Sequence, residues 1–274
     1  MKDMTPARFL RLAAAALVLT TVISVIMLIP DWNGLQGSAE AKDIDTLLDV
    51  MIVLSSLVFS VVLVMMGYAI WKYRAKPGDE SDGEPIHGNT RLEVIWTLIP
   101  TIIVIFGGVY STIVLNDIEA EASDSMRVDV TAQQFAWRFD YVDANKTSTE
   151  LHVPAGTQLE LHLQALDVLH SFWVPEWRIK RDLVPGASLD NPEGDDDIDN
   201  VVRVTPTVEG TYSVVCTELC GLGHSTMRAV ARTESQGEFD SWLSEQKEIP
   251  EGKVGNGAAG GVGAGSLADG AGAG

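Results

Sequence analysis

The sequence predicts a membrane-anchored all-β protein, in which a hairpin of transmembrane helices precedes a β-sandwich or barrel. Long apolar segments occur only before residue 116, and segments that alternate apolar and polar residues begin at about residue 126. The mean hydropathy is +0.13 although the formal net charge is -19. An acidic chain can have a positive mean hydropathy only if its apolar residues are segregated, here into membrane segments.

Three apolar segments cover residues 12–29, 50–70 and 94–115. A helix needs about 20 apolar residues to cross a hydrocarbon core of about 30 Å. The second and third segments meet this requirement with no charged residue inside. Pro100 is expected to kink the third helix, which packing in a bundle can tolerate. We therefore expect a transmembrane hairpin over residues 46–116.

The N-terminal region, residues 1–45, has two interpretations. Basic residues precede its apolar run, and Ala39-Glu40-Ala41 resembles the small-residue cleavage site of a signal peptide. The run is nevertheless long for a signal peptide, and this site lies some ten residues beyond the end of the run. The region is either a cleaved signal or a third transmembrane helix.

The loop between the second and third segments fixes the orientation. It carries Lys72, Arg74, Lys76 and Arg91. Positively charged loops remain in the cytoplasm, and acidic residues hardly weaken this rule. The chain is therefore expected in the plasma membrane as a multi-pass protein, with everything after about residue 116 outside the cytoplasm.

The extracytoplasmic part, residues 117–249, shows strand patterns. Apolar residues alternate with polar ones in QQFAWRFDY (133–141) and QLELHLQA (158–165), and VVRVTPTVEGTYSVV (201–215) reads as two strands around a turn. Several short strands separated by turns indicate a β-sandwich or barrel. Residues 250–274 are rich in Gly and Ala, cannot build a core, and are expected to be disordered.

The charge restricts the partners. With 38 acidic and 19 basic residues, the chain repels phosphate backbones, so we expect no nucleic-acid partner. The run EGDDDIDN (193–200) is interpreted as a solvated loop, with a docking patch for a basic partner as the alternative. Such an acidic composition is typical of adaptation to high salt. At high salt, charges are screened, so electrostatic steering of a partner is weak.

One twelve-residue stretch, CTELCGLGHSTM (216–227), contains both cysteines of the chain. Cys216, Cys220, His224 and Met227 give the spacing C-x3-C-x3-H-x2-M. Thiolate, imidazole and thioether are the soft-to-borderline ligands that copper prefers, and a weak Met ligand is typical of copper electron-transfer sites. The alternative on the cysteines alone is a disulfide, the default outside the cytoplasm.

Two thiolates four residues apart can bridge two metal ions, and each copper then needs one imidazole. His224 supplies one. His170 is the best candidate for the other, because it follows a predicted strand and precedes Pro175, where a loop would present it. His162 lies on the polar face of a strand and is expected to be exposed to solvent.

The stretch 216–227 resembles the dinuclear copper (CuA) loop of subunit II of haem–copper terminal oxidases. Four more stretches match that family in the same order, over roughly residues 45–245: WKYR (71–74), HGNTRLEVIWTLIP (87–100), QQFAWRFDY (133–141) and DVLHSFWVPEWRIKRDLVPG (167–186). The resemblance implies a cupredoxin-like copper domain. It also implies a function: the domain takes single electrons from an external donor and passes them to the haem of subunit I, for dioxygen reduction coupled to proton pumping.

The resemblance assigns roles by position. Cys216 and Cys220 would be bridging thiolates, His170 and His224 the imidazole ligands, and Met227 the weak axial ligand. Glu218 would bind copper through its backbone carbonyl, and its carboxylate would help to hold a magnesium ion at the interface with subunit I. Glu93 falls where many relatives have a carboxylate at the mouth of a proton channel, although an acid there also suits a helix N-terminus.

The aromatic strand, in which Phe135 and Trp137 would accept electrons, departs from the family pattern. The family has Trp at the first aromatic position, where it contacts cytochrome c, and this chain has Phe135. The expected donor is therefore either cytochrome c or a small blue-copper protein, soluble or membrane-anchored. Two alternative functions remain: a subunit of a copper-containing nitric oxide reductase, and a metal-free, membrane-anchored β-sandwich binding module.

Overall fold

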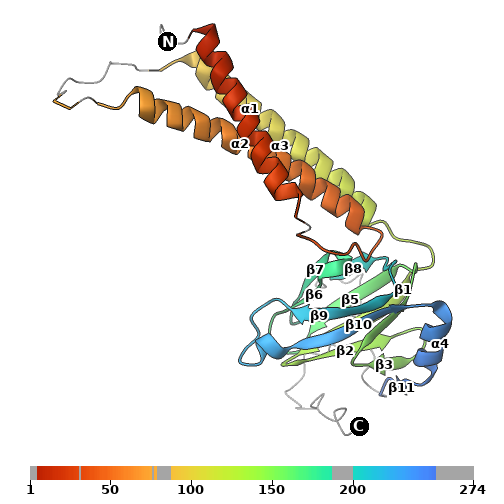
Figure 1. The fold of residues 1–274 in the computed structure, drawn as a ribbon. Helices are drawn as coiled ribbons and strands as arrows, with labels where there is room; N and C mark the ends of the chain where they lie inside the picture. Colours follow the sequence, from red (N-terminus) through yellow and green to blue (C-terminus); the bar gives the residue numbers. More distant parts are fainter. Residues whose placement is uncertain (1–4, 31, 76, 79–87, 187–199, 251–274) are drawn as a thin grey trace. The chain divides into compact units, whose positions relative to one another are not determined.

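A computed structural model of the chain describes residues 5–30, 32–75, 77–78, 88–186 and 200–250 (Figure 1). Most of the acidic run 193–200 and the Gly/Ala-rich tail, for which we predict a solvated loop and disorder, lie outside these residues. The chain divides into two compact units. One comprises residues 1–32 and 45–115, and the other residues 33–44 and 116–274.

The first unit contains helices long and apolar enough to cross a membrane: α1 (Pro6–Leu28), α2 (Ala41–Lys72) and α3 (Thr90–Ile118). α1 begins where the Thr5 side chain accepts a hydrogen bond from Arg8 N–H and Pro6 occupies the first turn. α3 continues through Pro100 as one helix. The predicted hairpin is thus confirmed, and the N-terminal apolar region is also helical.

Glu93 lies in the first turn of α3. Its Oε1 accepts a hydrogen bond from Asn89 N–H at 3.1 Å, and Asn89 Oδ1 accepts one from Leu92 N–H at 3.2 Å. This reciprocal pair satisfies N–H groups that the first turn would otherwise leave without partners. The geometry therefore shows the helix-capping role of Glu93 directly, and a proton-channel role remains a prediction.

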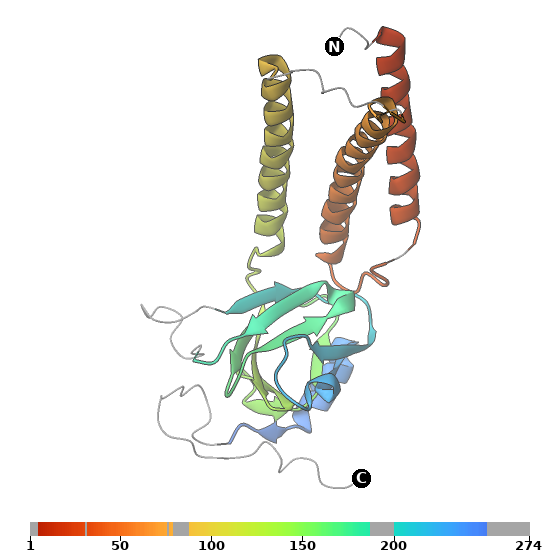
Figure 2. The same cartoon turned by 90° about the vertical axis from the view of Figure 1, so that its left-hand side faces the viewer.

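The second unit is a β-sandwich, as predicted, with strands gathered in two sheets (Figures 1 and 2). One sheet has the order β11-β3-β2-β1-β5-β8 and the other β4-β10-β9-β6-β7. Short helices η1 (Pro175–Trp177), η2 (His224–Thr226) and α4 (Gln236–Ser244) complete the unit. The strands are β1 (Met126–Gln133), β2 (Ala136–Tyr141), β3 (Lys146–Ser148), β4 (Leu151–Pro154), β5 (Leu159–Ala165), β6 (His170–Val174), β7 (Ile179–Leu183), β8 (Val201–Val204), β9 (Gly210–Cys216), β10 (Arg228–Glu234) and β11 (Lys247–Glu248).

The core lies between the two sheets and follows the alternation in the sequence. On β5, Leu159, Leu161 and Leu163 are fully or almost fully buried, and the residues between them are half-buried. Strict alternation of this kind places one face of a strand in the core. The predicted strand 133–141 is shorter than expected, because β1 ends at Gln133 and the chain turns before β2 begins at Ala136.

The segment between α1 and α2, residues 33–44, belongs to the β-sandwich unit. Gly37 N–H donates to the Glu176 carbonyl at 2.7 Å, and Ala39 N–H donates to the Thr205 carbonyl at 2.9 Å. The Ser38 hydroxyl donates to the Trp177 carbonyl at 3.0 Å. We predicted that the N-terminal region would end at residue 45, but its last part, residues 33–44, belongs to the sandwich unit. Hydrogen bonds to residues that are distant in sequence attach this segment to the sandwich.

The close packing of Gly37 leads to a stability prediction. A Cβ atom there would lie 3.0 Å from the Glu176 carbonyl oxygen and 3.2 Å from Trp177 Cδ1. We expect Gly37→Val to lower the free energy of unfolding by about 1–3 kcal/mol, because the surrounding backbone cannot move aside easily. Thermal unfolding of the full chain in detergent, followed by near-UV circular dichroism, measures this. Gly237→Ala is the control, since a Cβ there meets nothing within 4 Å.

Candidate metal centre

Pairing between β6 and β9 brings the distant histidine to the cysteines. Phe172 on β6 is the register partner of Cys216 on β9, and the strands run antiparallel. His170, two residues before Phe172, therefore lies beside the loop that follows Cys216. That loop returns through η2 to β10, and Cys216 N–H donates to the Met227 carbonyl at 3.2 Å. Strand pairing thus closes the loop on itself.

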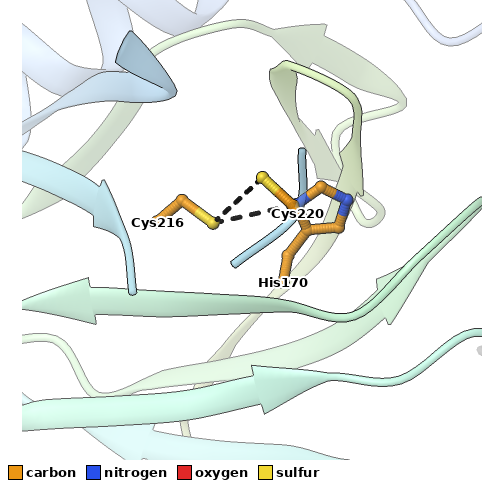
Figure 3. Close-up of side chains that lie close together, drawn as sticks. All are labelled: His170, Cys216 and Cys220. Atoms are coloured by element: carbon orange, nitrogen blue, oxygen red, sulfur yellow. Dashed lines mark hydrogen bonds between the residues drawn. The ribbon is translucent and has the colours of Figure 1, made fainter. Parts of the chain in front are cut away.

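The donor atoms form one connected group around the two sulfurs. Cys216 Sγ lies 3.9 Å from Cys220 Sγ, 3.8 Å from His170 Nδ1 and 3.3 Å from the Glu218 carbonyl oxygen. Cys220 Sγ lies 3.6 Å from His224 Nδ1 and 3.8 Å from Met227 Sδ. Figure 3 shows His170, Cys216 and Cys220 pointing toward one another. All six predicted copper ligands therefore come together, with one imidazole nearer each sulfur.

These distances fit a metal and do not fit a disulfide. Both cysteines are free, and 3.9 Å is almost twice the length of an S–S bond. An ion with metal–sulfur bonds of about 2.3 Å can contact both sulfurs at this separation. The ligand atoms of His170, Cys216 and Cys220 all lie within 4.8 Å of one another and belong to buried residues. The disulfide alternative is thus wrong for this structure.

A carboxylate orients His170. Asp167 Oδ1 lies 2.9 Å from His170 Nε2, which leaves Nδ1 directed at the sulfurs. Asp167 Oδ2 also accepts from Gln134 N–H at 2.7 Å, and the Gln134 side-chain amide donates to the Cys220 carbonyl. Partial burial alone would raise the pKa of Asp167, but hydrogen bonds from Gln134 N–H, His170 and Val168 N–H outweigh it and lower the pKa. Asp167 and Gln134 therefore join three segments around the site.

We expect Asp167→Asn to weaken copper binding by about 10- to 100-fold, the usual effect of losing a carboxylate that orients a metal-bound imidazole. An asparagine amide cannot accept from His170, Val168 N–H and Gln134 N–H together, so the ring orientation is lost. Competition with a chelator of known affinity measures the change. Asp143→Asn removes an equal charge from an exposed position and should leave the affinity unchanged.

Burial raises the pKa of the Cys220 thiol to about 11, and its hydrogen bond with Cys216 adds to the increase. Copper binds the thiolate, so binding must release this proton. The apparent copper affinity is therefore expected to rise about tenfold per pH unit between about pH 6 and 9 from this thiol alone. Chelator competition across that range measures the slope, and a flat profile would contradict the assignment.

The same raised pKa acts on the metal-free domain in the opposite direction. A protonated thiol stabilises the folded state below its unfolded pKa of 9.0, and this contribution is lost as the pH rises toward about 11. The metal-free domain should therefore unfold more easily at pH 11 than at pH 8, whereas bound copper should remove most of that difference.

The two aromatic residues predicted to accept electrons differ in exposure. Phe135 is 40% exposed, in the turn between β1 and β2, and its ring lies over Gly223, where a Cβ would come within 3 Å of it. Trp137 is only 3% exposed and packs edge-on against Phe172 and His170. Trp137 does not contact a donor directly, because its ring faces the core from β2, and its role in electron entry stays a prediction. Of these two aromatic residues, only Phe135 is exposed enough to touch a donor.

Several functional features escaped the sequence interpretation. Asp167 and Gln134 gave no pattern of their own, since their partners are distant in sequence. His152 is buried on β4, where its ring stacks on that of Trp242 with 3.8 Å between the ring centroids, and its Nδ1 lies 3.0 Å from a Glu234 carboxylate oxygen. His162, expected to be exposed, is half-buried beside Glu160 at 2.8 Å. Both histidines stabilise the sandwich at places away from the copper ligands.

The fold and the site define a class: a membrane-anchored electron-transfer protein with an extracytoplasmic copper domain. Comparison with known proteins agrees. Residues 33–114 match the transmembrane domain of cytochrome c oxidase subunit II, and residues 139–234 match its periplasmic domain. Cytochrome c oxidase subunit 2 of Thermostichus vulcanus is 31% identical over 82% of this chain and 84% of its own length. That of Alkalihalophilus pseudofirmus is 32% identical over 87% and 68%.

The chain belongs to the cytochrome c oxidase subunit II family. It is therefore the electron-accepting subunit of a terminal oxidase, it binds copper, and its C-terminal domain lies outside the cytoplasm. Among solved structures, the periplasmic domain of subunit II from Bradyrhizobium japonicum is 23% identical over 46% of this chain and 94% of that domain, with a TM-score of 0.39.

Proposed function

We propose that the chain holds two copper ions in one centre, bridged by Cys216 and Cys220. The observation that carries this proposal is the arrangement of donors: two sulfurs 3.9 Å apart, with one imidazole near each of them. A mononuclear blue-copper site uses two imidazoles but only one thiolate, so it is the second thiolate that favours two ions. The Glu218 carbonyl and the Met227 thioether supply a further donor beside each sulfur.

Bound copper would supply a one-electron redox couple. The chain's own residues keep the geometry of that couple fixed, since His170 and Met227 are almost fully buried and Asp167 holds the imidazole of His170. Backbone bonds from β9 and β10 fix both ends of the loop. A site whose ligands barely move on oxidation or reduction exchanges electrons quickly, because little reorganisation accompanies the transfer. No bond to a substrate forms here.

The copper count and spectrum test this proposal. The full-length chain, purified in detergent and saturated with copper, should contain two ions. Its EPR spectrum should show a seven-line pattern, because one unpaired electron is shared by two copper nuclei. One ion with a four-line pattern would reject the dinuclear centre. The metal-free binding module, the alternative function, predicts no copper uptake at all.

The surface around the site supports contact with an electron donor. Within residues 116–186 and 200–250, every large apolar side chain that is exposed lies in one of three segments near the copper ligands. These residues are Phe135, Leu166, Val168, Leu169, Trp173, Leu219 and Leu222. An exposed apolar patch on an otherwise acidic chain indicates a protein-contact surface. The donor, a cytochrome c or a small blue-copper protein, would approach the metal across this patch.

Two further roles complete the proposal. The Glu218 carboxylate would help to hold magnesium at the contact with subunit I, and Glu93 would lie at the mouth of a proton channel on the cytoplasmic side. Electrons would continue to the haem of subunit I, where dioxygen is reduced with proton pumping. Identifying the subunits that copurify with the chain separates this oxidase from a nitric oxide reductase, which would have a different catalytic subunit.

A further inference from the structure

The N-terminal helix α1 precedes the residues that match the family's transmembrane domain, which begin at residue 33. Its sequence alone is compatible with a cleaved signal or with a retained membrane helix. The side chains buried along α1 and α2, and the hydrogen bonds of the segment that joins these helices, distinguish the two cases.

Small side chains form a buried stripe on α1. Ala16, Thr20 and Ser24 recur every four residues, so they lie on one face of the helix. Ala16 and Ser24 are buried and Thr20 is half-buried, whereas Leu17 and Val18 beside them are 60% and 64% exposed. A single face of a helix is buried in this way where another helix packs against it.

A matching pair of small residues lies on α2. Ser56 and Ser60 are one turn apart and buried, Ser60 completely. α3 approaches a different face of α2, because a Cβ at Gly107 would lie 3.5 Å from Met51 Cε. Ser56 and Ser60 lie about 140° and 180° around α2 from Met51. Of the helices in this unit, α1 is left to cover them, and it crosses α2 in Figure 1 and lies beside it in Figure 2.

Two buried hydroxyls favour direct contact between these faces. The Ser24 and Ser60 hydroxyl oxygens have no hydrogen-bond partner among the described residues. A buried hydroxyl without a partner costs free energy in apolar surroundings. Small residues let two helix backbones approach closely, and serine hydroxyls can then hydrogen-bond across the interface. Both hydroxyls therefore favour an α1 that stays packed on α2.

The joining segment gives independent support. Cleavage after Ala41 would remove residues 33–41 from the sandwich unit. Thr205 N–H would lose both Glu40 carboxylate oxygens, each at 3.0 Å, and Ser38 Oγ would no longer accept from Ala41 N–H at 3.2 Å. A positively charged α-amino group would then lie in the first turn of α2, where the helix dipole disfavours a cation. The folded chain thus uses the residues that cleavage would discard.

We propose that α1 remains in the mature protein as an additional membrane helix and packs against α2 through Ala16, Ser24, Ser56 and Ser60. The basic residues at the start of the chain stay in the cytoplasm, as the rule for positively charged segments requires. The proposal involves no copper ligand, so it stands or falls separately from the proposed electron transfer.

Intact-mass spectrometry of the chain purified from its native membrane tests whether α1 is retained. The mass should fit a chain that includes all of α1. A mass that fits a chain starting at residue 42, or anywhere else beyond Leu28, would overturn the proposal.

Cysteine cross-linking in the copper-loaded full-length chain tests the packing. Trypsin cuts after Lys42 and so separates α1 from α2. A short bifunctional thiol reagent should link the two tryptic peptides in Ser24→Cys/Ser60→Cys, because both side chains lie in the interface. In the control, Val18→Cys/Ser60→Cys, the first thiol lies on the exposed face of α1 and should give at least about tenfold less linked product.

The outcomes separate packing from mere retention. Copper bound at Cys216 and Cys220 keeps the native thiols out of the reaction, and an unchanged copper spectrum shows that each variant is folded. An intact α1 without a link between residues 24 and 60 would overturn the packing. Equal linking in both variants would show that α1 has no fixed face toward α2, which would also overturn it.

Discussion

Cys220→Ser is expected to reduce the bound copper from two ions to at most one and to abolish electron transfer into the oxidase. Serine is a harder ligand with a far less acidic proton, so it cannot replace a bridging thiolate. The sulfur of Cys220 is also the atom nearest His224 and Met227 among the copper ligands, at 3.6 and 3.8 Å. Its loss therefore disconnects three donors at once.

Metal analysis and EPR of the purified variant measure this outcome, together with oxygen consumption by the complex. The seven-line pattern should give way to a four-line pattern or to no signal. The rate should fall at least about 100-fold, because a single remaining thiolate leaves no shared redox unit. Ser225→Ala, in the same loop, changes an exposed hydroxyl and keeps every donor, so it should behave as the wild type does. Two coppers in the serine variant would reject the bridging role.

Leu222→Glu is expected to lower the second-order rate of electron transfer from the donor by about 10- to 100-fold. Leu222 is fully exposed at the tip of the copper loop, between two glycines that pack against Phe135. A carboxylate there must be desolvated when an apolar donor surface covers it, and central contact residues commonly contribute this much to binding. Stopped-flow reduction of the copper centre by the purified donor measures the rate.

The matched control for this variant is Thr207→Glu, which adds the same charge at an exposed position in the turn before β9. Its rate should match that of the wild type. For the wild type, an apolar contact also predicts a rate that changes little between moderate and molar salt, whereas charge steering is screened strongly over that range. A steep fall with salt, or equal losses in both variants, would show that overall charge guides the donor.

Much of the fold could be predicted because its causes are local. Hydropathy over about 20 residues predicts a membrane helix, and the confirmed helices α2 and α3 contain the whole of their apolar runs. α3 extends only a few residues beyond its run, whereas α2 begins at Ala41, more than two turns before its run. Alternation predicted β5 and the two strands around Pro206 for the same reason. Where the prediction failed, at 133–141, the alternating pattern ran through a turn. Periodicity in apolar residues cannot distinguish a turn residue such as Phe135 from the next strand residue.

The copper ligands were also accessible from sequence, since five of the six lie within twelve residues and their chemistry is selective. His170 is different: its role rested on elimination and family resemblance, and β6–β9 pairing places it at Cys216. Trp137 shows the limit, because the sequence indicated an aromatic residue suitable for electron transfer but could not indicate that its ring faces the core. The exposure of the Trp137 ring depends on the other sheet, in which Phe172 on β6 packs against it.

By itself, the sequence determined the membrane anchor, the orientation, the sandwich class and the set of soft ligands, because each depends on residues close together along the chain. Only the tertiary structure decided which partners support them. The contacts of Asp167 with His170, of Gln134 with the Cys220 carbonyl and of Gly37 with the Glu176 carbonyl all join segments that are distant in sequence. Such contacts arise from strand pairing and sheet packing, so the neighbours of each residue depend on the tertiary fold and not on its position in the sequence.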